Sequence, residues 1–105
     1  MADRGSTSET VRRPVRPPLQ LYETFVRVSE TLSFLGASKL VGVSQPAVSQ
    51  AIAKLEDYYP GPLFIRRRGG PLRLTPVGEA LLPYAKAMLH AADRSFITTN
   101  DAATC

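Results

Sequence analysis

The sequence predicts a mainly α-helical domain: a core of three short helices, a two-stranded β-hairpin and a long C-terminal helix. Apolar residues recur at spacings of three and four in four separate stretches, which is the period of an amphipathic helix. Ser44 and Thr75 each stand just before a proline-containing first turn, a common way for a helix to begin. Two short apolar runs flank an arginine- and glycine-rich segment at residues 66–70, which is typical of a hairpin.

The first two helices are expected between Leu19 and Gly42. The first should stop near Thr31, because Ser33 can act as the N-cap of the second. The apolar positions of the first helix are Leu21, Phe25, Val28 and Leu32. Those of the second are Phe34, Ala37, Leu40 and Val41. Gly42 is expected to end the second helix, since glycine readily takes the left-handed conformation found after a helix.

A third helix is expected to start at Gln45, after the capping residue Ser44 and with Pro46 in its first turn. Only residues 41–44 separate it from the second helix, and a short glycine-containing connection is expected of a helix-turn-helix. Its apolar face consists of Val48, Ile52 and Leu55. The polar residues on its other faces, free for solvent or a ligand, are Gln45, Ser49, Gln50 and Lys54.

The hairpin is predicted on both sides of residues 67–71, with strand-like runs at 63–65 and 72–74. It also holds most of the positive charge. The formal net charge of +4 divides into +4 for residues 60–75, +2 for residues 1–18 and −1 for each of the two remaining segments. The basic residues of the hairpin are Arg66, Arg67, Arg68 and Arg73, with no acidic residue among them. Such a segment suits a polyanion, although a solvated loop has the same charge.

The last helix is expected to begin at Pro76 after the cap Thr75, and to bend near Pro83, which removes a backbone hydrogen bond. Its broad apolar side consists of Val77, Leu81, Tyr84, Ala85, Met88, Leu89 and Ala92. From about Ser95 the periodicity is lost, and we expect fraying. The chain therefore divides into a flexible Ser-, Arg- and Pro-rich arm (1–18), a domain (19–75), a linker helix (76–94) and a frayed tail (95–105).

The composition argues against an enzyme, a metalloprotein and a membrane protein. The single histidine, His90, and the single cysteine, Cys105, leave no set of groups that could converge on a catalytic or zinc site. No apolar run approaches the roughly 18 residues needed to cross a bilayer. One cysteine cannot form an intramolecular disulfide, which fits a cytoplasmic setting. No cofactor is expected.

A set of residues spread from Leu19 to Leu89 resembles a known family. These residues are Phe25, Ser33, Phe34, Ala37, Leu40, the run 43–50, Leu55, Glu56, Leu63, Phe64, Arg66, Leu74, Thr75, Gly78 and Leu81. In this order and at these separations they resemble the N-terminal winged helix-turn-helix domain of LysR-type transcriptional regulators. The arginine-rich hairpin and the segment 58–62 depart from the usual pattern of that family, which leaves the contacts of the individual arginines open.

The resemblance implies that the third helix reads bases in the major groove and that the hairpin forms a wing on phosphates or in the minor groove. The amides of Gln45 and Gln50 suit adenine, whereas Pro46 can contact a thymine methyl group. The DNA-binding residues implied are Ser33, Ser44, Gln45, Pro46, Ser49, Gln50, Lys54, Arg66, Arg67, Arg68 and Arg73. The alternative is that these residues only cap and solvate exposed structure.

The last helix resembles the linker helix through which two such domains pair. The dimerisation residues implied are Leu81, Ala85, Met88 and Leu89. A homodimer would read an interrupted inverted repeat, unless the helix packs only on its own domain. We therefore expect sequence-specific double-stranded DNA binding in bacterial transcription regulation, in the cytoplasm at the nucleoid, with no membrane contact. No small-molecule effector is expected, because the family's effector-binding domain is absent from these 105 residues.

A protein-interaction module is the alternative function. Such a module would keep the winged helix and pair with a full-length regulator through the linker helix, or resemble the N-terminal domain of molybdate-responsive regulators. The salt dependence of binding distinguishes DNA binding from protein interaction. Phosphate binding weakens steeply with salt through counterion release, whereas apolar helix pairing changes little or strengthens.

Overall fold

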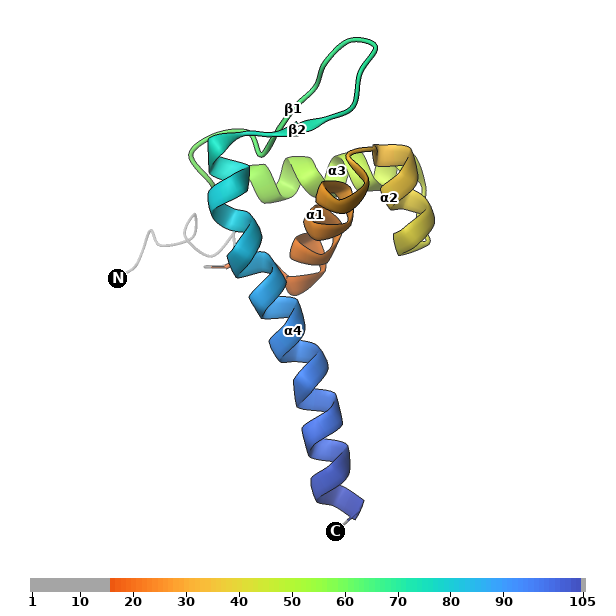
Figure 1. The fold of residues 1–105 in the computed structure, drawn as a ribbon, viewed down its shortest axis with the longest axis vertical. Helices are drawn as coiled ribbons and strands as arrows, with labels where there is room; N and C mark the ends of the chain where they lie inside the picture. Colours follow the sequence, from red (N-terminus) through yellow and green to blue (C-terminus); the bar gives the residue numbers. More distant parts are fainter. Residues whose placement is uncertain (1–15, 105) are drawn as a thin grey trace, which may run out of the picture.

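The protein is a winged helix-turn-helix domain with a long helix that leads away from it (Figure 1). A computed structural model describes residues 16–104. Its elements are α1 (Leu19–Thr31), α2 (Phe34–Val41), α3 (Gln45–Glu56), β1 (Phe64–Ile65), β2 (Arg73–Leu74) and α4 (Pro76–Thr104). The hairpin projects from one end of the three-helix core, and α4 runs in the opposite direction (Figure 1). Most of the expected flexible arm lies outside the described residues, as does Cys105.

The helix ends follow the local signals in the sequence. The Ser33 hydroxyl oxygen accepts a hydrogen bond from the Gly36 amide at 2.9 Å. The Ser44 oxygen accepts one from the Ala47 amide at 3.2 Å. The Thr75 hydroxyl oxygen likewise accepts one from the Gly78 amide at 3.0 Å. All three predicted N-caps are therefore confirmed, and Gly42 ends α2 with a positive φ of 83°. The connection is one residue shorter than expected, because Val41 still belongs to α2.

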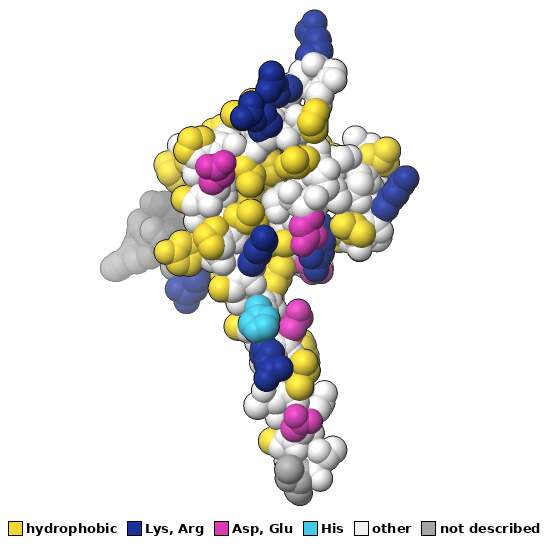
Figure 2. Space-filling view, viewed as in Figure 1, with side chains coloured by type: hydrophobic (Ala, Val, Ile, Leu, Met, Phe, Trp, Pro, Cys, Tyr) yellow, Lys and Arg dark blue, Asp and Glu magenta, His cyan; other side chains and the backbone are white. Residues whose placement is uncertain are grey.

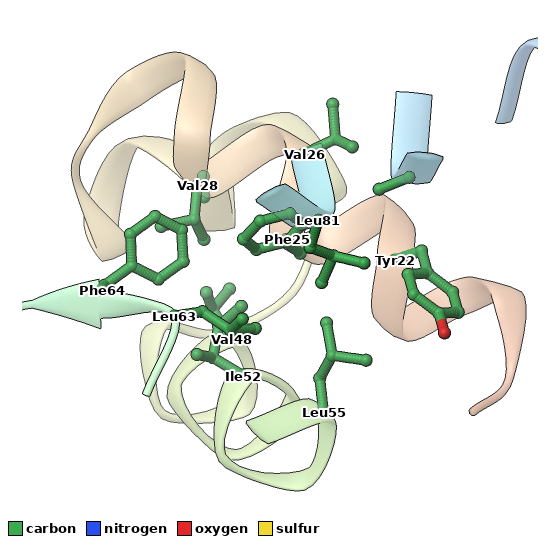
Figure 3. Close-up of a cluster of buried hydrophobic side chains, with 12 residues drawn as sticks. Tyr22, Phe25, Val26, Val28, Val48, Ile52, Leu55, Leu63, Phe64 and Leu81 are labelled. Atoms are coloured by element: carbon green, nitrogen blue, oxygen red, sulfur yellow. The ribbon is translucent and has the colours of Figure 1, made fainter. Parts of the chain in front are cut away.

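The core lies where α1 crosses α3 (Figure 3). The predicted face of α3, Val48, Ile52 and Leu55, is buried to 0–1% exposure. Phe25 of α1 is also fully buried, and its ring lies 5.5 Å from that of Phe64 in β1. Apolar contact on this scale fixes the rotation of α3 about its axis. The apolar position Leu40 is different: its side chain is 60% exposed, because it lies on the solvent side of the short α2.

The base of the hairpin is held from both sides. β1 and β2 pair antiparallel, with Phe64 opposite Leu74, one residue shorter at each run than predicted. The Leu63 amide donates to a Glu56 carboxylate oxygen at 2.8 Å. Gly78, in the first turn of α4, lies so close to Leu63 that an added Cβ would collide with the Leu63 carbonyl oxygen. α3 and α4 thus anchor the chain just before β1.

Two tyrosines join α1 to the segment after α3. The hydroxyl groups of Tyr22 and Tyr59 are hydrogen-bonded at 2.6 Å. Burial, followed by this hydrogen bond and the electrostatic influence of Tyr22, raises the pKa of the Tyr59 hydroxyl above its ordinary range. The neutral phenol is therefore the form that the folded protein favours.

The C-terminal part of α4 corrects the expectation of a frayed tail. The helix continues through residues 95–104 and ends at Thr104. No glycine or proline follows Pro83, so nothing in this stretch breaks the backbone ladder. Hydroxyl groups of Ser95, Thr99 and Thr104 donate to carbonyl groups one turn earlier. Loss of apolar periodicity therefore did not mark the end of the helix, and the bend at Pro83 stays a prediction.

Candidate nucleic-acid interface

The outward side of α3 is the first part of the candidate interface. With Val48, Ile52 and Leu55 turned into the core, Pro46 and Gln50 lie on the opposite side and are exposed. Gln45 and Lys54 are exposed too, whereas Ser49 is half-buried beside the core. The structure therefore keeps most of the predicted α3 residues accessible and leaves Ser49 with less room for a ligand.

One α3 residue on this side was missed by sequence reasoning. Ala53 is exposed and follows Pro46 and Gln50 at helical spacing, so the three share one face. Its methyl group adds a small apolar surface next to Gln50. The helical period could have identified it, but an alanine carries no hydrogen-bonding group that draws attention.

Two of the three serines in the predicted set also cap helices. The oxygens of Ser33 and Ser44 each cap a helix by accepting a backbone N–H. A capping hydroxyl can still donate its own proton to an acceptor such as a phosphate oxygen. The Ser44 cap does occupy one of the amide groups at the start of α3, so an anion at this end of the helix would find fewer free donors.

The four hairpin arginines divide into two groups. Arg67, Arg68 and Arg73 line a shallow hollow at the wing tip together with Gly69, Gly70 and Pro71. The tip turns at Gly69, whose φ of 73° suits glycine, and the Gly70 amide donates to the Arg67 carbonyl at 3.3 Å. Arg66 instead lies over the Phe34 ring of α2, with 4.7 Å between its guanidinium carbon and the ring centroid.

The wing end of the molecule is strongly basic. Figure 2 shows basic side chains on the projecting hairpin, which are arginines, and no acidic side chain on it in this view. The sequence agrees, since residues 60–75 contain four arginines and no acid. Guanidinium groups on an exposed turn are suited to phosphate groups, which they can bind in bidentate fashion.

The predicted dimerisation residues of α4 do not share one environment. Leu81 and Ala85 are only 7% and 0% exposed because they pack in the domain's own core, so the expectation is corrected for these two. Met88 and Leu89 are half-buried, partly against that core. The large apolar side chains of α4 that remain well exposed are Tyr84, Phe96 and Ile97.

Within residues 16–104, no three His, Cys, Asp or Glu side chains gather where they could hold a metal ion. In the same part of the chain, no helix combines the length and the apolar character needed to cross a membrane.

The fold and this surface define a winged helix-turn-helix protein with an accessible third helix and a basic wing. Residues 19–79 match the family model described as the bacterial regulatory helix-turn-helix protein, lysR family. The chain belongs to that family, whose members act by DNA binding in transcription regulation.

Known proteins support this assignment. The HTH-type transcriptional regulator HdfR of Yersinia enterocolitica is 43% identical over 70 residues, which cover 67% of this chain and 24% of the relative. The chain thus spans about a quarter of the length of the curated relatives it matches. A crystal structure of a CbnR_DBD–DNA complex has a TM-score of 0.75 and 30% identity, covering 83% of this chain and 99% of that one. A BenM_DBD complex with catB site 1 DNA has a TM-score of 0.78 and 29% identity, covering 85% and 99%.

Proposed function

We propose that the chain recognises specific sites in double-stranded DNA, with α3 in the major groove and the wing on neighbouring phosphates or in the minor groove. One observation carries the proposal. Burial of one side of α3 fixes the opposite side, with Pro46 and Gln50, outward on a domain whose wing is free of acidic residues. A major groove about 12 Å wide accepts a single helix presented in this way.

The side chains of α3 supply the chemistry of base reading in this proposal. Gln45 and Gln50 each carry a donor and an acceptor, the pair that bidentate recognition of adenine needs. Pro46 offers apolar contact to a thymine methyl group. Lys54 and the hydroxyl group of Ser49 are assigned to phosphates or base edges at the flanks of the groove.

The wing and the capping serines supply backbone contacts. We assign Arg66, Arg67, Arg68 and Arg73 to phosphate oxygens or the minor groove, since all four lie in the acid-free hairpin. Ser33 and Ser44 are assigned to phosphates through the hydroxyl protons that their caps leave available.

Pairing through α4 completes the proposal. Met88 and Leu89 are half-buried on α4, and Tyr84 and Phe96 on the same helix are 69% exposed. A second copy that covers them would form a homodimer related by a two-fold axis, and two recognition helices would then read an interrupted inverted repeat. The expected setting is the bacterial cytoplasm, at the nucleoid, with no catalytic role.

Selection on randomised duplexes tests this function. The purified protein is incubated with duplexes of random sequence, the retained molecules are amplified and sequenced, and the best site is measured over a range of salt concentrations. We expect an interrupted inverted repeat whose binding constant falls steeply with salt. Retention without sequence enrichment would contradict specific recognition, and the absence of any salt-dependent retention would contradict DNA binding altogether.

A protein-interaction module remains the second candidate, favoured by the exposure of Phe96 and Ile97 near the end of α4. In that case α4 would pair with a full-length regulator, and sedimentation would show a complex that persists as salt is raised. Replacing Phe96 with Ser should then abolish the complex. The same change at Phe34 cannot serve as a control, because Phe34 packs against the core.

A further inference from the structure

The turn between α1 and α2 contacts both strands of the wing at the same level. Arg66 directly follows β1, and its guanidinium lies over the ring of Phe34 at 4.7 Å from the centroid. Leu72 directly precedes β2, and its amide donates to the Leu32 carbonyl at 3.2 Å. Each strand of the wing is thus attached to residues 32–34 immediately beyond the two-residue ladder.

This turn is firm enough to act as a support. The Thr31 hydroxyl oxygen accepts from the Ser33 amide at 3.3 Å and donates to the Ser33 carbonyl at 2.9 Å. Ser33 in turn caps α2, and Leu32 is held in the left-handed conformation with a φ of 52°. The ring of Phe34 packs partly against the hydrophobic core. The position of the aromatic face is therefore set by the core and not by the wing.

Arg66 differs from the other wing arginines in what surrounds it. Arg67, Arg68 and Arg73 line the hollow at the tip, whereas Arg66 lies back over α2. An aromatic face attracts a guanidinium through its quadrupole, and the two planes can also stack. An aliphatic side chain of similar size would fill the same space without that attraction.

We infer that Phe34 is a positioning residue for DNA binding, which holds Arg66 over α2 and, with the Leu32–Leu72 hydrogen bond, fixes the angle of the wing relative to α3. The two-residue ladder alone leaves that angle free to vary, because a two-stranded ribbon of this length is marginal by itself. The Glu56–Leu63 hydrogen bond and Gly78 hold the base of the hairpin, and the α1–α2 turn holds the strands beyond the ladder. The inference rests on the proposed DNA-binding function.

The first experiment needs no DNA, so its outcome is independent of the proposed function. NMR spectra of the free chain are compared for wild type, Phe34→Leu and Phe34→Tyr. We expect the ring current of Phe34 to shift the side-chain protons of Arg66 upfield in the wild type and in Phe34→Tyr. In Phe34→Leu the upfield shift should vanish, and backbone order should fall in residues 66–72 but not in α3. Unchanged Arg66 shifts and wing order in Phe34→Leu would overturn the inference.

The second experiment measures affinity for a mixed-sequence duplex at several salt concentrations. Loss of an exposed cation–π contact predicts binding about two- to fivefold weaker for Phe34→Leu, and wild-type binding for Phe34→Tyr. The double variant Phe34→Leu/Arg66→Ala should bind like Arg66→Ala alone, because Phe34 acts through Arg66. Additive losses in the double variant would overturn the inference. If the wild type binds no duplex, the proposed function fails and the NMR comparison still decides the contact.

Arg66→Gln tests the same contact in case Phe34→Leu does not fold. Arg66 is exposed, so its replacement leaves the core intact. We expect Arg66→Gln to lower wing order in the NMR experiment, and Arg66→Lys to restore part of it by keeping the cation over the ring. Circular dichroism and the melting temperature establish that each variant is folded. Wild-type wing order in Arg66→Gln would contradict the positioning role even without data on Phe34→Leu.

Discussion

α3 and the wing share the candidate interface but are supported in different ways. α3 is fixed by three buried side chains and a capped first turn, whereas the wing tip is exposed and held by a two-residue ladder and a few contacts at its base. The chemical groups on each part suit the way in which that part is held. Amide groups, whose hydrogen bonds need a defined direction, lie on the rigid helix, and guanidinium groups lie on the projecting tip, where charge attracts phosphates over a longer range.

The largest effect expected from this contrast is on stability. Ile52→Ala in α3 should lower the free energy of unfolding by about 2–5 kcal/mol, because it removes a 1% exposed side chain from the core. Ile65→Ala in β1 is the matched control, since Ile65 is 47% exposed, and it should cost less than about 1 kcal/mol. Urea denaturation measures both. Equal losses would show that the wing is as firmly held as α3.

The next effect concerns the choice of sequence. Gln50→Ala should reduce discrimination at one base step by about 1–3 kcal/mol while leaving affinity for random duplex nearly unchanged. Competition binding against single-base variants of the selected site measures this. Gln20→Ala removes the same group from the start of α1 and should leave discrimination intact. Equal losses on specific and random DNA would remove Gln50 from the base-reading set.

A smaller effect is expected at the start of α3. Ser44→Ala should cost about 1 kcal/mol of stability, because the Ala47 amide loses its hydrogen-bond acceptor. Ser44→Asn keeps an acceptor at the N-cap and should retain most of the wild-type stability. Thermal and urea unfolding compare the three proteins. A fully stable Ser44→Ala would mean that packing alone fixes the first turn of α3.

The smallest change in stability is expected at the wing tip. Arg67→Ala should alter the free energy of unfolding by less than about 0.5 kcal/mol, yet reduce the slope of log binding constant against log salt by about one unit. Arg94→Ala removes the same charge from the exposed part of α4 and should leave the slope unchanged. If both variants reduce the slope equally, net charge and not the position of the wing determines binding.

Local signals explain what the sequence could predict. Ser33, Gly42 and Ser44 act on their immediate neighbours, so the ends of α2 and the start of α3 followed from the residue types alone. The face of α3 followed from its period. The proposed DNA-binding residues came from the family resemblance, and their individual contacts stay predictions.

Contacts between distant parts of the chain explain what was missed. Two such contacts join Phe34 to Arg66 and Glu56 to Leu63. They form only in the folded core, and no local sequence pattern around these residues predicts them. Likewise, the apolar stripe that contains Leu81 does not indicate from the sequence whether a partner or α1 covers it. The structure assigns Leu81 to the core.

The hydrogen-bonded pair Tyr22 and Tyr59 allows folding to be followed by tyrosine absorbance. The chain has four tyrosines and no tryptophan, so ionised phenols dominate its near-ultraviolet absorbance at high pH. Because folding raises the pKa of Tyr59 above its ordinary value of 10.0, the unfolded chain gives up this proton first. The protonated Tyr59 hydroxyl therefore stabilises the fold fully below pH 10.0, and this contribution is lost as the pH rises through the raised pKa of the folded state. Ionisation of Tyr59, read from tyrosinate absorbance, should therefore occur at a lower pH in the urea-unfolded chain than in the folded protein.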